Sequence, residues 1–130
     1  MGDLKVTKLT SKKDKANYIY QLLRDIEALD KMINNGLIEK SPIRVGAEQE
    51  FCLVTNEFNP SSNSMEILEA ISDDHFTTEI GNYNLEIYLD DFVLKDDCFS
   101  KIHIQLETLL DKGKTAAKEK DTKFVLTGIL

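Results

Sequence analysis

Residues 45–54 read Val-Gly-Ala-Glu-Gln-Glu-Phe-Cys-Leu-Val, an apolar run of strand-forming residues that contains two carboxylates. Because side chains alternate along a strand, Glu48 and Glu50 share one face, and Phe51 and Leu53 share the other. The two carboxylates then stand about 6.5–7 Å apart, where they can reach one hard cation or flank a pair of cations. We therefore interpret Glu48 and Glu50 as candidate metal ligands.

A second acidic stretch lies in residues 76–89, where apolar residues and polar residues alternate and predict another strand. This alternation places Glu86 on the polar face. Glu79 lies seven residues earlier, so an unbroken strand would point the two carboxylates to opposite faces. A glycine within a strand often marks a bulge, so we expect a bulge at Gly81 to bring Glu79 to the face of Glu86.

Helical spacing of apolar residues predicts amphipathic helices over residues 16–34 and 97–118. The small residues near the end of the second helix indicate close packing against a sheet. A shorter helix is expected over residues 65–71, with Ser64 as a possible N-cap, and a final apolar strand over residues 123–130.

These elements predict an α+β fold with a mainly antiparallel sheet and helices packed on one face. The expected strands lie near residues 43–54, 78–89 and 123–130. We divide the chain into an N-terminal arm and amphipathic helix (1–40) and a larger region (41–130), together forming one compact unit.

The composition is that of an ordinary globular protein of 130 residues, with a net charge of −7. This charge argues against nucleic-acid or anionic-membrane partners, because phosphate binding needs a basic surface. Cys52 and Cys98 are expected to be unpaired, partly buried thiols, which fits a reduced cytoplasmic setting. His75 has no second histidine or cysteine at ligand spacing, so we interpret it as a loop histidine.

Four clustered carboxylates, Glu48, Glu50, Glu79 and Glu86, would repel one another unless solvent or a cation offsets their charge. Mg²⁺ is typically held by one or two carboxylates together with substrate phosphates, which suits phosphoryl transfer. A glycosidase also uses a pair of carboxylates, but it does not need four. A solvated polar sheet face is the remaining interpretation.

The motifs Val-Gly-Ala-Glu-Gln-Glu-Phe at 45–51 and Thr-Glu-Ile-Gly-Asn-Tyr-Asn-Leu-Glu-Ile at 78–87 are similar to those of a known family. Together with Val-Leu-Thr-Gly-Ile-Leu at 125–130, this pattern resembles the N-terminal part of the glutamate–cysteine ligase family, second class, with its carboxylate–amine ligase relatives. The resemblance covers residues 43–130.

The resemblance implies part of a glutamine-synthetase-like catalytic domain, with ATP and divalent cations on the concave face of an antiparallel sheet. It implies Glu48, Glu50, Glu79 and Glu86 as ligands of Mg²⁺ or Mn²⁺. It also implies ATP as co-substrate, amino acid substrates and the ligase chemistry of glutathione biosynthesis, in which an acyl phosphate is attacked by an amine.

The chain is several times shorter than enzymes of this family. We therefore expect an N-terminal fragment of a longer ligase that supplies metal ligands and is inactive alone. The alternative is a non-catalytic acidic interaction module that kept the fold without the chemistry. Because a truncated sheet exposes strand edges, we expect the isolated chain to form a homodimer.

Overall fold

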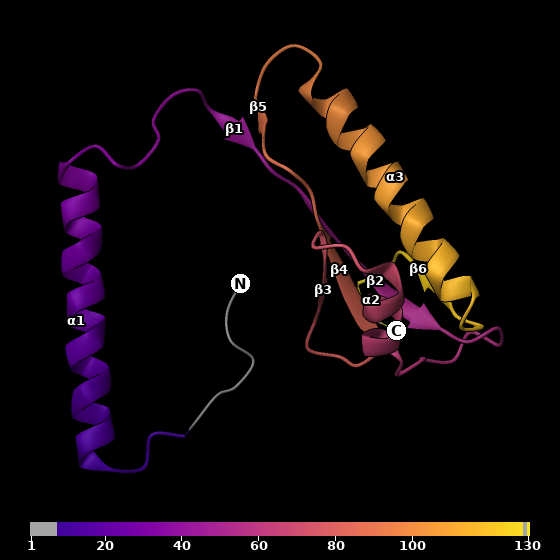
Figure 1. Cartoon of the computed structure of the whole chain (residues 1–130), viewed down its shortest axis with the longest axis horizontal. Coiled ribbons are helices and arrows are strands. Elements are labelled where there is room, and N and C mark those ends of the chain that lie inside the picture. Colours follow the sequence, from indigo (N-terminus) through magenta and orange to yellow (C-terminus); the bar gives the residue numbers. More distant parts are fainter. Residues whose placement is uncertain (1–7, 129) are drawn as a thin grey trace. The chain divides into compact units, whose positions relative to one another are not determined.

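A computed structural model describes residues 8–128 and 130 of the chain. Its elements are α1 (Lys12–Asn34), β1 (Arg44–Val45), β2 (Glu48–Val54), α2 (Ser64–Ile71), β3 (Phe76–Thr78), β4 (Asn84–Tyr88), β5 (Phe92–Val93), α3 (Cys98–Lys118) and β6 (Lys123–Val125) (Figure 1). Every strand pair within the described residues is antiparallel, which confirms the predicted α+β class with an antiparallel sheet.

The chain divides into two units, Met1–Ser41 and Pro42–Leu130, close to the boundary that the sequence predicts. The first unit contains α1, in which no residue is buried. The helix starts four residues earlier than predicted because the Ser11 hydroxyl accepts a hydrogen bond from the Asp14 backbone N–H at 3.0 Å. The predictions that this helix packs on the sheet and that the whole chain forms one compact unit are not tested by these contacts and stay predictions.

The main sheet of the second unit has four strands in the order β3-β4-β2-β6. In the ladder between β2 and β4, Phe51 is opposite Leu85 and Glu50 is opposite Glu86. The predicted first strand, 43–54, is interrupted: β1 pairs with β5 in a separate two-stranded sheet, and β2 begins only at Glu48. Residues 43–54 therefore contribute two short strands to two separate sheets and do not form one long strand.

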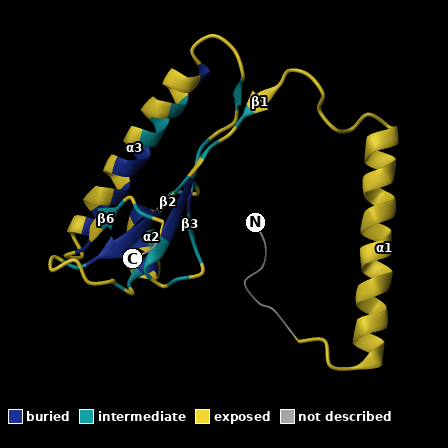
Figure 2. Cartoon of the chain, turned by 180° about the vertical axis from the view of Figure 1, so that it is seen from behind, coloured by how far each residue is buried: buried dark blue, intermediate teal, exposed yellow. Residues whose placement is uncertain are grey.

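The core lies on one face of the main sheet, where α2 and α3 cover it (Figure 2). Phe51 stacks on Phe124 with ring centroids 4.0 Å apart. The buried core residues are Phe51, Leu53, Ile67, Ile71, Phe76, Leu85, Ile87, Leu109, Leu110, Ala116 and Ala117. The burial of Ala116 and Ala117 bears out the close packing expected of the end of α3. Cys52 and Cys98 are buried and unpaired, as expected.

Three local predictions differ from the structure. Ser64 is the first residue of α2 and is buried, so Asn63 rather than Ser64 occupies the N-cap position. The last strand ends at Val125, whereas the prediction extended it to residue 130; Ile129 lies outside the described residues. The strand expected over 76–89 is a hairpin of β3 and β4.

His75 lies in the turn before β3, as the loop prediction requires, and is half-buried between two carboxylates. Its Nδ1 lies 2.8 Å from Asp73 Oδ1, and its Nε2 lies 3.4 Å from Asp90 Oδ1. The hydrogen bond with Asp73 is the main cause that raises the pKa of His75. Lys112 of α3 donates a hydrogen bond to Asp73 at 2.6 Å, so this network ties α3 to the sheet.

A substitution at Gly113 of α3 tests how closely the helix packs on the sheet. A Cβ there would lie 2.6 Å from one ring carbon of Phe124 and 3.0 Å from Phe76. Alanine favours a helix over glycine by about 1 kcal/mol, but overpacking a core costs about 1–3 kcal/mol. We expect Gly113→Ala to lower the free energy of unfolding by about 1 kcal/mol, measured by urea denaturation. The exposed neighbour variant Lys114→Ala should change it little, and a more stable Gly113→Ala would contradict this packing.

Candidate acidic site

The face of the main sheet opposite α2 and α3 carries the carboxylates. Alternation along β2 sends Phe51 into the core and Glu50 to the opposite side, and the same alternation along β4 places Glu86 beside Glu50. We call this side the acidic face. In the strands it comprises Glu48, Glu50, Cys52, Thr77, Asn84, Glu86 and Tyr88, and Glu79 follows Thr77 by two residues.

Glu79 reaches the acidic face through a hairpin and not through a bulge, so the predicted bulge at Gly81 is wrong. Thr77 of β3 is opposite Glu86 of β4, and Glu79 follows Thr77 by two residues, which returns its side chain to the same face. Gly81 lies in the connection between the strands, where its carbonyl accepts a hydrogen bond from the Asn84 N–H at 2.9 Å. The turn between β3 and β4 therefore explains why Glu79 and Glu86, seven positions apart, lie on the same face.

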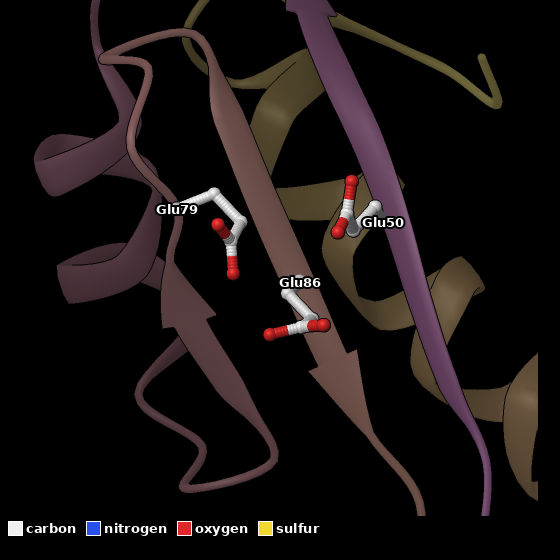
Figure 3. A group of neighbouring side chains, drawn as sticks. All are labelled: Glu50, Glu79 and Glu86. Carbon is white, nitrogen blue, oxygen red and sulfur yellow. The ribbon is translucent and has the colours of Figure 1, made fainter. Parts of the chain in front are cut away.

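All four predicted carboxylates lie on this face, and three of them come close together. Among the described residues, Glu50, Glu79 and Glu86 each offer a carboxylate oxygen, and these oxygens lie within 4.8 Å of one another (Figure 3). We call these residues the glutamate triad. Glu86 is buried at 4% exposure, Glu79 is half-buried and Glu50 is exposed. Glu48 lies on the same face opposite Tyr88 but outside the triad.

Burial is the main cause that raises the pKa of Glu86 above its ordinary value of 4.5. The Tyr88 hydroxyl donates a hydrogen bond to Glu86 and opposes that shift, while Glu79 and Glu48 reinforce it. The same hydrogen bond, together with burial and the negative charge of the neighbouring carboxylates, raises the pKa of Tyr88 to about 12. Glu86 thus retains a proton more readily than an exposed glutamate, and it shares a hydrogen bond with Glu79.

Tyr88 is a residue of the site that our sequence reading missed. It follows Glu86 by two positions in the same strand, so alternation alone places it on the acidic face. Beside it, at the interruption between β1 and β2, a hollow of about 570 Å³ is lined by Gly46, Ala47, Glu48, Tyr88 and Leu89. The hollow lies at the Glu48 end of the acidic face.

The donor chemistry of the triad fits a hard divalent cation. Two oxygens on one cation are separated by at most twice the metal–oxygen distance, about 4.2 Å for Mg²⁺ and about 5 Å for Ca²⁺. The oxygens of the triad lie within 4.8 Å of one another, so a small inward rotation of the side chains would suit Mg²⁺. None of the residues that make up the acidic face is a lysine or arginine, so a bound cation would supply positive charge for a phosphate there.

Comparisons with protein-family models, with curated proteins and with solved structures find no match for this chain. The resemblance to glutamate–cysteine ligases therefore stays a prediction. No helix among the described residues combines the length and apolarity that crossing a bilayer requires.

The raised pKa of Glu86 predicts a specific pH dependence of stability. The stabilisation from protonated Glu86 is complete below pH 4.5 and is lost as the pH rises through the higher folded pKa. Gln cannot ionise, so Glu86→Gln should raise the free energy of unfolding at pH 7. Urea denaturation between pH 4.5 and pH 7 measures this difference, which should shrink toward the acidic end.

The matched control is Glu57→Gln, which removes the same charge from an exposed loop position. It should leave the pH dependence of the wild-type chain unchanged. A Glu86→Gln variant that is less stable than wild type at every pH would mean that Glu86 is ionised and well stabilised in the folded chain.

Proposed function

We propose that this chain carries the cation-binding face of an ATP-dependent carboxylate–amine ligase of the glutamate–cysteine type, with Glu50, Glu79 and Glu86 as ligands of Mg²⁺ or Mn²⁺. The observation that carries the proposal is the meeting of three carboxylates, from β2, β4 and the end of β3, on the sheet face that the helices leave open. One of the three is buried, where an isolated charge is costly and a bound cation would offset that cost.

The motif residues support the same assignment. Glu50 belongs to the Gly-x-Glu-x-Glu pattern, and Glu79 and Glu86 are the two glutamates of the Glu-(x)6-Glu pattern that the resemblance rests on. The pairing of β2 with β4 brings these two patterns onto neighbouring strands. Glu48 lies on the same face outside the triad and would be a fourth ligand.

The chain's own residues have three tasks in this proposal. The triad would hold the cation, which supplies positive charge beside the phosphates of ATP during acyl-phosphate formation. The hydroxyl of Tyr88 fixes the carboxylate of Glu86 by its hydrogen bond. The open hollow beside Glu48 leaves room for substrate. The amino acid substrates, and a cytoplasmic location suited to the two free cysteines, belong to this proposal as well.

The isolated chain is proposed to be inactive and to form a two-fold homodimer. The edge strands β3 and β6 of the main sheet each have one open side that a second copy could cover. Light scattering at several concentrations tests the dimer, and a constant monomer mass would contradict it.

Thermal melting with divalent cations tests the cation site. A ligand that binds only the folded state raises the melting temperature, so millimolar Mg²⁺ or Mn²⁺ should raise it for the wild-type chain. We expect weak affinity, with a dissociation constant of about 10⁻⁴–10⁻³ M, because the site is open. The double variant Glu50→Gln with Glu79→Gln should lose the increment and stay folded without metal.

The control is Glu57→Gln, which removes a charge from an exposed loop position outside the triad and should keep the increment. An equal increment in the triad double variant would show that these glutamates are not the ligands and would favour the acidic interaction module. ATP hydrolysis or amide formation by the purified chain above a blank would contradict inactivity.

A further inference from the structure

A cavity lined by three lysines lies in the second unit and shares no residue with the acidic face. The cavity has a volume of about 610 Å³ and lies where the last turns of α3, the start of β6 and the loop after β2 meet. Its lining residues are Asn56, Lys114, Lys118, Asp121, Lys123 and Phe124. Ligand pockets for small molecules typically have volumes of about 300–1,000 Å³, so this cavity could hold one.

Three lysines and one aspartate line this cavity, in a chain whose net charge is −7, and Lys114 Nζ also lies 3.5 Å from Asp111 Oδ1. A lysine near a helix C-terminus stabilises the helix by its interaction with the helix dipole, and this effect accounts for the position of Lys118. That effect does not account for Lys123, which comes from β6. Its Nζ donates a hydrogen bond to the Asn56 carbonyl at 3.3 Å and lies 4.7 Å from the centre of the Phe58 ring. These contacts hold the third ammonium group at the cavity.

Phe124 gives the cavity an apolar aromatic wall. Its ring is half-buried and is held on one side by the stacked ring of Phe51, with centroids 4.0 Å apart. Gly113 lies so close to this ring that it leaves no room for a side chain between them. The wall is therefore fixed by the core, and the ammonium groups surround it at the surface.

We infer that this cavity binds a small phosphate ester, with the phosphate between Lys118 and Lys123 and an apolar, flat body against Phe124. Lysine binds phosphate as a point charge, and several ammonium groups around one cavity raise the local concentration of anions. The inference does not depend on the proposed ligase function, because the cavity shares no residue with the acidic face.

Nuclear magnetic resonance titration of the full chain tests the inference, with EDTA present to exclude metal-mediated binding. Phenyl phosphate and inorganic phosphate form a matched pair of probes, with and without an aromatic body. Phenyl phosphate should shift the backbone amide signals of Lys118, Asp121 and Lys123 with saturation at millimolar concentration. Inorganic phosphate should bind there at least about threefold more weakly, since it lacks the contact with Phe124.

The variant Lys118→Gln with Lys123→Gln should weaken phenyl phosphate binding by about tenfold. The control Lys95→Gln with Lys101→Gln removes the same charge from exposed positions at and before the start of α3 and should bind as wild type does. Unchanged signals elsewhere in the spectrum show that each variant is folded. Shifts that do not saturate, equal losses in both double variants, or equal affinity for the two probes would overturn the inference.

Discussion

The antiparallel pairing of β2 with β4 is the constraint on which the rest of the second unit depends. Its register sets Phe51 opposite Leu85 on the core face and Glu50 opposite Glu86 on the other face. Like charges placed directly opposite each other destabilise a sheet, so the buried apolar pairs must offset that repulsion. A slip of one residue would bring the carboxylates into the core and expose the apolar residues. The same register thus stabilises the fold and concentrates the charge.

Much of this arrangement could be predicted because alternation is a local property. The common face of Glu48 and Glu50, and the covering of the opposite face by α3, follow from period-two and helical spacing within single elements. The hairpin of β3 and β4 could not be read in this way. Its two short strands are joined by a five-residue connection, 79–83, whose Tyr83 continues the apolar alternation of β4. Periodicity alone therefore predicts one strand where the chain reverses.

The composition of the site depends on contacts between strands, which single-strand patterns do not contain. The exclusion of Glu48 from the triad reflects its position at the last pair of the ladder, beyond the reach of Glu79. The burial of Glu86, which changes its pKa, arises because β4 lies between β2 and β3. Neither property is visible in residues 45–54 or 76–89 alone.

We propose that Glu50, Glu79 and Glu86 together hold a divalent cation, and that the cation displaces the proton of Glu86. Carbon-detected nuclear magnetic resonance of the side-chain carboxyl groups, followed through a pH titration with and without Mg²⁺, tests this claim most directly. Without metal, Glu86 should titrate above its ordinary pKa of 4.5, and its midpoint should fall when Mg²⁺ is added, because the cation favours the ionised form. An unperturbed titration of Glu86, or a midpoint that Mg²⁺ does not move, would contradict the account.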